Sequence, residues 1–150
     1  MSQLDELYQS LILDHNRRPR NPGPLASANR EARGRNPLCG DECTLWLRVE
    51  DGVVAEVAQA GSGCAISKAS ASVLTTVVRG QPIAEVARLF DGFHRLVTGQ
   101  GDGAADLPRP LAAFAGVSRF PMRVKCASMA WHALRQALAA DLPASPAGRP

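Results

Sequence analysis

The sequence predicts an α+β fold in which a small antiparallel sheet, of about three strands, packs against several helices. Residues 42–60 contain two stretches of alternating apolar and polar residues joined by Asp51-Gly52, a dipeptide that favours a tight hairpin turn. Elsewhere, apolar residues recur at intervals of three and four, as they do on one face of a helix. Because a tight hairpin is the only clear connection between strands, we expect an antiparallel sheet.

Turn and cap signals divide the rest of the chain into helices and loops. The expected helices span residues 3–16, 66–80, 82–90, 111–115 and 127–140. Residues 18–37 are expected to form a long polar loop or an extended arm, and residues 91–106, rich in Gly and Asp, a flexible excursion. Residues 1–142 are therefore expected to form one domain, and residues 143–150 a disordered Pro- and Ala-rich tail.

Composition argues against several classes of protein. No apolar run approaches the roughly 18 residues of a membrane helix, and the N-terminus lacks a secretory signal pattern, so we expect a cytoplasmic protein without a membrane partner. The formal charge is +3, and six arginines crowd residues 17–35. This favours a solvated basic loop, with a docking surface for an acidic protein partner as the alternative. Nucleic acid is not an expected partner, because only 5% of residues are aromatic and none lies among these arginines.

The four cysteines are expected to serve metal or thiol chemistry, because separated cysteines in a reducing cytosol seldom form a disulfide framework. Cys43 alternates in phase with Leu45 and Leu47, so it is expected to be a small core residue. Cys39 lies beside Asp41 across a glycine that lets the chain bend. Cys64 is expected at a helix start, where unpaired N–H groups favour the thiolate.

Cys126 is also expected to open a helix, with Arg123 and Lys125 nearby to lower its pKa. Three such thiols and the carboxylate of Asp41 could make a four-coordinate site. Zinc accepts sulfur and oxygen ligands in tetrahedral geometry, and the excess negative charge would need cationic neighbours, for which Arg123 and Lys125 are candidates. The spacing is not that of a paired zinc ribbon or finger.

Three segments resemble the signature motifs of SufU proteins, which belong to the IscU/NifU-like superfamily. They are residues 36–41 (Asn-Pro-Leu-Cys-Gly-Asp), 61–67 (Gly-Ser-Gly-Cys-Ala-Ile-Ser) and 123–131 (Arg-Val-Lys-Cys-Ala-Ser-Met-Ala-Trp). Residues 8–23 are similar too, and the resemblance covers roughly residues 4–140. It implies an α+β fold with a three-stranded antiparallel sheet.

The resemblance also implies a function and a set of site residues. Zinc would be bound by the residues that match Cys39, Asp41, Cys64 and Cys126. The protein would be a sulfurtransferase of iron–sulfur cluster assembly, in which Cys39 accepts persulfide sulfur from a SufS-type cysteine desulfurase. The sulfur would then pass toward a SufB-containing assembly scaffold. Arg123 is a second catalytic candidate, which either pairs with the anionic site or steers the partner's persulfide.

Two other functions stay open. An IscU-type scaffold would build the iron–sulfur cluster on itself, but IscU proteins carry a histidine immediately before the last cysteine, where this chain has Lys125. The stretch between Cys64 and Cys126 is also longer than in IscU and matches the SufU insertion. The other alternative is a structural zinc module that binds a partner without chemistry.

Overall fold

The computed structural model describes residues 3–37, 40–100 and 107–141 of this chain. Four strands form one sheet in the order β1-β2-β3-β4, and every pairing is antiparallel. The elements follow in the order α1 (Gln3–Arg17), β1 (Arg30–Asn36), β2 (Asp41–Glu50), β3 (Val53–Ser62), α2 (Ala65–Val78), β4 (Gln81–Pro82), α3 (Ile83–Val97), α4 (Arg109–Ala112), the 3₁₀ helix η2 (Ala113–Arg119) and α5 (Pro121–Ala137). The predicted α+β class with an antiparallel sheet is confirmed.

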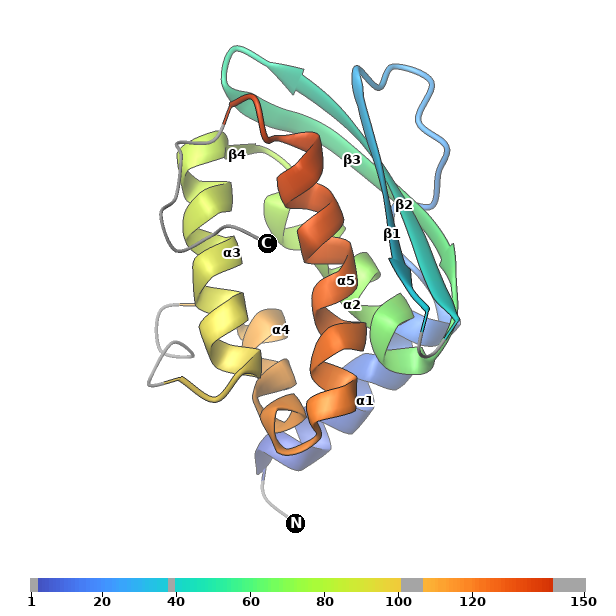
Figure 1. Ribbon diagram of the computed structural model, residues 1–150, viewed down its shortest axis with the longest axis vertical. Helices are drawn as coiled ribbons and strands as arrows, with labels where there is room; N and C mark the ends of the chain where they lie inside the picture. Colours follow the sequence, from blue (N-terminus) through green and yellow to red (C-terminus); the bar gives the residue numbers. More distant parts are fainter. Residues whose placement is uncertain (1–2, 38–39, 101–106, 142–150) are drawn as a thin grey trace.

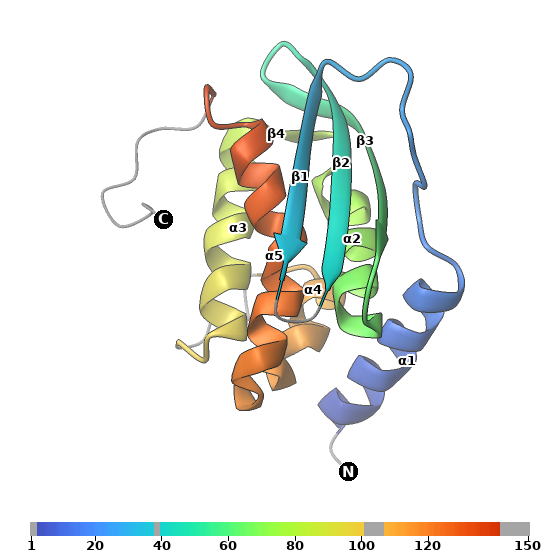
Figure 2. The ribbon, with the colours of Figure 1, turned by 45° about the vertical axis from the view of Figure 1, so that its right-hand side comes forward.

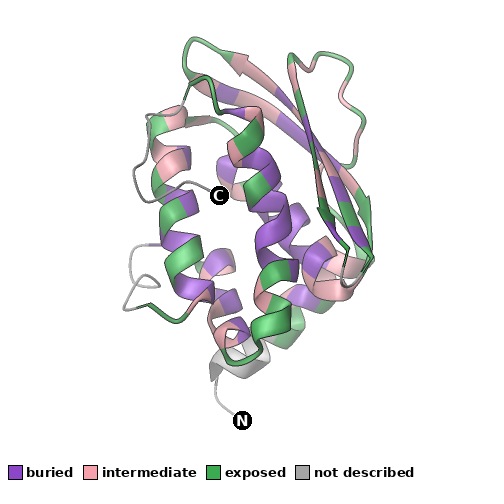
Figure 3. Cartoon of the chain, viewed as in Figure 1, coloured by how far each residue is buried: buried purple, intermediate pink, exposed green. Residues whose placement is uncertain are grey.

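The helices cover one face of the sheet, with α2 and α5 against it and α3 beyond α5 (Figures 1 and 2). The expected alternation in β2 is confirmed, since Cys43, Leu45 and Leu47 are buried while their sequence neighbours are at least partly exposed. Helices α3 and α5 turn buried residues toward the interior of the molecule and exposed residues outward (Figure 3). The buried residues of the sheet and the helices form a single packed core.

The hairpin between β2 and β3 has the predicted turn, because Asp51 and Gly52 both take positive φ angles of 51° and 75°. The prediction of a polar loop or extended arm over residues 18–37 was wrong in part, because residues 30–36 form strand β1, which pairs along β2. This strand escaped prediction because it carries few apolar residues. Within it, only Ala32 and Asn36 are buried.

Two predicted helix boundaries were also wrong. Helix α3 continues to Val97 instead of ending near residue 90, because Phe93, Leu96 and Val97 enter the core. Its Gly92 allows a close approach, since a Cβ there would lie 2.7 Å from Leu107 Cδ2. The part of the expected excursion at 101–106, and the predicted tail, lie outside the described residues. Helix α5 begins at residue 121 rather than 127, with Pro121 in its first turn. No helix in the described part of the chain is long and apolar enough to cross a membrane.

A polar network fixes the end of α1 to helix α2. The backbone N–H of Arg20 donates to Ser72 Oγ at 2.8 Å, and the same hydroxyl is hydrogen-bonded to His15 Nδ1 at 2.7 Å. His15 is only 7% exposed. Burial, followed by repulsion from Arg20, lowers the pKa of His15, so the neutral ring is the form that fits.

We predict that acid destabilises the protein through His15. Because its pKa is lower in the folded chain than in the unfolded chain, the stabilisation is complete above about pH 6.5 and declines as the pH falls through the folded value. His15→Gln should flatten the dependence of the free energy of unfolding on pH between 7 and 5, as measured by urea denaturation. The exposed His94→Gln serves as the matched control. Parallel curves for wild type and His15→Gln would contradict the prediction.

Candidate metal and sulfur site

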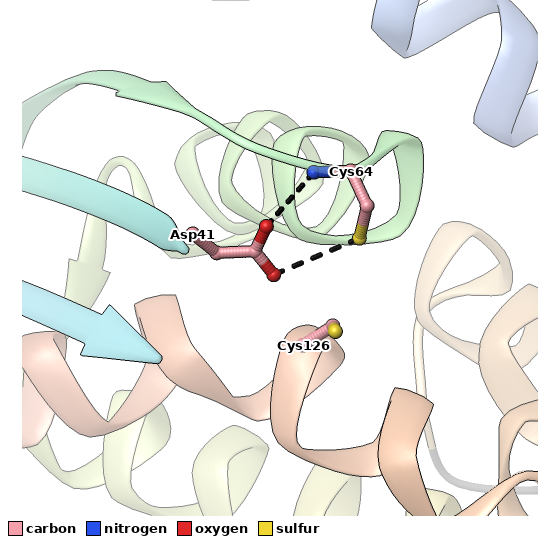
Figure 4. Close-up of side chains that lie close together, drawn as sticks. All are labelled: Asp41, Cys64 and Cys126. Atoms are coloured by element: carbon pink, nitrogen blue, oxygen red, sulfur yellow. Dashed lines mark hydrogen bonds between the residues drawn. The ribbon is translucent and has the colours of Figure 1, made fainter. Parts of the chain in front are cut away.

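Three potential ligand atoms from separate elements converge at one end of the sheet. A carboxylate oxygen of Asp41 and the Sγ atoms of Cys64 and Cys126 all lie within 4.8 Å of one another (Figure 4). Two sulfurs on one tetrahedral zinc would lie about 3.8 Å apart, from a Zn–S bond of about 2.3 Å. Small side-chain shifts would therefore bring these three atoms to coordination distance.

Asp41 is the first residue of β2, and its carboxylate is 1% exposed. Its Oδ1 accepts the backbone N–H of Cys64 at 2.9 Å, and the thiol of Cys64 donates to its Oδ2 at 3.7 Å. Gly63, with a φ of 138°, makes this contact possible, because a Cβ there would lie 2.1 Å from Asp41 Oδ1. The absence of a side chain at Gly63 thus leaves room for the carboxylate of Asp41 beside Cys64.

Cys64 caps the N-terminus of α2, as predicted. Its Sγ accepts the backbone N–H of Ser67 at 3.5 Å, one of the unpaired donors of the first helical turn. The first turn of α2 therefore holds this sulfur in place beside Asp41.

Cys126 is fully buried, but it lies in the second turn of α5 and not at the helix start. The prediction placed the helix start too late because the apolar pattern is clear only from residue 127 onward. In the second turn, the Cys126 Sγ does not meet the unpaired N–H groups of the helix N-terminus, and its hydrogen-bond partners include Met122 and Asn36. It donates to Met122 O at 3.6 Å, and Asn36 Nδ2 donates to it at 3.8 Å. Asn36 was not predicted as a site residue, and its only signal was its place in the first motif.

Arg123 brings positive charge to both sulfurs from one turn before Cys126. Attraction to Cys64 and a hydrogen bond to Cys126 raise the pKa of its guanidinium. The side chain is exposed, so it can also meet a molecule that approaches from solvent. Lys125 is exposed too, and its predicted neutralising role stays a prediction.

Of the other candidate residues, Cys43 and the three histidines are described by the structure and Cys39 is not. Cys39 lies outside the described residues, so its place at the site stays a prediction. Cys43 belongs to the core as expected, and burial raises the pKa of its thiol to about 11. His15, His94 and His132, the three histidines of the chain, do not belong to the described ligand cluster.

A family model described as "NifU-like N terminal domain" matches residues 7–142. The chain belongs to this family. The assignment to the IscU/NifU-like superfamily, made from three short motifs, is therefore confirmed.

Individual relatives include both kinds of protein that the motifs left open. The zinc-dependent sulfurtransferase SufU of Bacillus subtilis is 36% identical over 93% of this chain and 95% of its own length. The iron–sulfur cluster assembly scaffold protein IscU of Streptococcus pyogenes is 36% identical over 92% of this chain and 86% of its own length. A crystal structure from Fervidobacterium islandicum, titled as an iron–sulfur cluster assembly scaffold protein for the SUF system (FiSufU), superposes with a TM-score of 0.81 at 30% identity, over 89% of this chain and 97% of that one.

We predict that Gly63→Ala destabilises the fold by about 3 kcal/mol or more. The new Cβ combines an unfavourable φ with a collision that displaces the buried carboxylate of Asp41 and leaves the Cys64 N–H unpaired. Gly52→Ala is the matched control, because Gly52 also has positive φ but no atom within 4 Å of the added Cβ. Its cost should be about 1 kcal/mol. Equal losses in urea denaturation would show that contact with Asp41 is unimportant.

We also predict an order of thiol alkylation in the metal-free protein. Iodoacetamide at pH 8 should modify Cys64, which is partly exposed, well before Cys43, which is buried and stays protonated below about pH 11. Peptide mapping by mass spectrometry after timed quenching measures both rates. Cys43 should react only after denaturant is added, and comparable rates in the native protein would overturn the assignment of Cys43 to the core.

Proposed function

We propose that this protein is a zinc-dependent sulfur acceptor of iron–sulfur cluster assembly, which receives persulfide sulfur from a SufS-type cysteine desulfurase. The observation that carries the proposal is the convergence of Asp41, Cys64 and Cys126, which offers two sulfurs and one oxygen to a single ion. The similarity to the zinc-dependent sulfurtransferase SufU of Bacillus subtilis, at 36% identity over 93% of this chain, supports it. A SufB-containing scaffold is the proposed recipient of the sulfur.

Cys39 is the proposed fourth ligand and the sulfur acceptor. Its Cα can lie no more than about 7 Å from that of Asp41, because only two peptide units separate them. The described neighbours on either side, Asn36 and Asp41, both contact the cluster. A third sulfur, as the fourth ligand, would complete the tetrahedral shell, in which zinc holds thiolates without redox chemistry of its own.

The sulfur-transfer step needs no external oxidant or reductant. The thiolate of Cys39 attacks the outer sulfur of the desulfurase persulfide, forming one S–S bond while the S–S bond of the partner breaks. The partner's cysteine leaves as a thiolate, and the persulfide now resides on Cys39. Arg123, beside Cys64 and Cys126, stabilises the negative charge that is present throughout.

A scaffold function is the second candidate, because a relative named as an IscU scaffold is just as similar. The residue before Cys126 favours sulfur transfer instead. Cluster scaffolds of the IscU type carry histidine there, whereas Lys125 is exposed and, as an ammonium, has no lone pair to offer a metal.

We predict that Cys39→Ala abolishes persulfide transfer. The purified protein should contain stoichiometric zinc by metal analysis. With L-cysteine and a SufS-type desulfurase, mass spectrometry should find the added sulfur on Cys39, and alanine release by the desulfurase should accelerate. Cys43→Ala is the matched control, because it removes a thiol from the core and not from the site. Normal sulfur transfer by Cys39→Ala would exclude Cys39 as the acceptor.

The same preparation distinguishes the alternatives. Anaerobic addition of ferrous iron to the complete mixture should leave zinc bound and give no cluster absorption on this chain. Stable cluster formation with loss of zinc would favour the scaffold function. Stoichiometric zinc with no sulfur transfer in any mixture would leave a structural zinc module. Arg123→Ala, assayed for zinc and for sulfur transfer separately, divides a charge-pairing role from a steering role.

A further inference from the structure

Two histidines from different helices meet at the surface of the molecule. His94 lies in the last turn of α3 and His132 in α5, and these two helices run side by side (Figure 1). The centroids of the two rings are 6.4 Å apart, with an angle of 70° between the ring planes. Both residues are exposed, and neither ring has a hydrogen-bond partner among the residues that the structure describes. Their ring nitrogens are therefore open to a ligand.

Phe90 supports both rings from the core side. It lies one turn before His94 on α3 and is only 9% exposed. Its ring is parallel to that of His94, at a centroid distance of 6.4 Å, and meets the ring of His132 edge-on at 5.7 Å. Because Phe90 belongs to the packed core, it limits how far the two imidazoles can move apart. A ligand that needs both rings together would find them already paired, which lowers the entropy lost on binding.

The separation of the rings suits one shared metal ion. A ring nitrogen lies about 1.2 Å from its centroid and about 2.0 Å from a bound zinc ion, so each centroid lies about 3.2 Å from the metal. Two imidazoles on one ion therefore have centroids about 5 to 6.5 Å apart, depending on the angle at the metal. The observed 6.4 Å falls at the upper end of this range. Small rotations of the two exposed side chains would bring both nitrogens to one ion.

The surroundings of the pair offer neutral oxygen donors. Both histidines line a cavity of about 620 Å³, together with Ser128 and Gln136, which lie one turn before and one turn after His132. The Ser128 Oγ is buried and has no hydrogen-bond partner among the described residues, and Gln136 carries an amide oxygen. None of the described residues that line the cavity has a carboxylate. Imidazole suits late first-row metals such as zinc and nickel, whereas calcium and magnesium take mainly carboxylate and other oxygen ligands.

The nearby charges keep His132 neutral. Desolvation of the ring, followed by repulsion from His94 and Arg135, lowers the pKa of His132, and only an unprotonated imidazole has a lone pair for a metal. The guanidinium of Arg135 lies 5.1 Å from the centroid of Phe90. Its charge favours the neutral imidazole but opposes a second cation, so removal of this charge should strengthen metal binding.

We propose that His94 and His132 form a second metal site, which holds one late first-row divalent ion between α3 and α5. His132 lies six positions beyond Cys126, which is about 9 Å along the helix, so this site is separate from the sulfur site. None of its ligands is a cysteine. Its failure and the failure of the proposed sulfur transfer are therefore distinguishable.

The first test titrates Ni²⁺ into the full-length, zinc-loaded protein at pH 7.5 by isothermal titration calorimetry. One Ni²⁺ should bind per chain without release of zinc. His94→Gln and His132→Gln should each weaken binding at least tenfold, and Arg135→Gln should strengthen it. His15→Gln is the matched control, because His15 is buried against Ser72, and it should change the affinity less than twofold. Circular dichroism melting should show that every variant folds. Equal affinity in wild type and His132→Gln would overturn the proposal.

A second measurement locates the ion without reference to the sulfur site. The chain has three histidines, so a long-range ¹H–¹⁵N spectrum should resolve each imidazole. Substoichiometric Ni²⁺, which is paramagnetic, should broaden the signals of His94 and His132 together and leave those of His15 sharp. Both effects should fade as the pH falls from 7.5 to 5.5, because protonated imidazole cannot bind a metal. Broadening of one ring alone would mean ordinary binding to a single surface histidine and would contradict a shared site.

Discussion

The site depends on one buried contact, in which the carboxylate of Asp41 accepts the backbone N–H of Cys64. The β2–β3 hairpin brings the two residues together, because antiparallel pairing places the start of β2 against the end of β3, with Glu42 opposite Ser62. The acid then ties that strand end to the N-terminus of α2. Gly63 has to lack a side chain for the two to meet. The β2–β3 hairpin therefore fixes two of the three described ligands.

The third ligand, Cys126, comes from a distant part of the sequence. It brings a second sulfur next to the carboxylate of Asp41, so the site needs positive charge to balance its ligands. Ionisation of both thiols beside the carboxylate, within 4.8 Å of one another, would place three negative charges together where burial removes the water that would screen them. The described residues supply one guanidinium beside the two sulfurs, that of Arg123, with hydrogen bonds from Asn36, Ser67 and the Cys64 backbone. A divalent cation would supply the charge that these groups lack, and the sulfur-rich donor set suits zinc.

The sequence was informative where local chemistry decides the structure. The Asp51-Gly52 turn and the in-phase burial of Cys43, Leu45 and Leu47 follow from neighbours in the chain, as does the cap formed by Cys64. Strand β1 was missed because its pairing with β2, and not its own composition, makes it a strand. The role of Asn36 was missed for a related reason, because it depends on a contact with Cys126, which lies 90 positions away. The start of α5 was placed too late because the apolar pattern is clear only from residue 127 onward.

Asn36 connects the end of strand β1 to the sulfur site. Its buried amide donates to the sulfur of Cys126 in helix α5. An ion that binds this sulfur changes how firmly the amide is held, and a shift of the amide changes how strongly the sulfur binds an ion. Linkage requires the two effects to be equal in free energy. Asn36 would therefore couple the end of β1 to the hold on Cys126, without movement of the sheet or of helix α5.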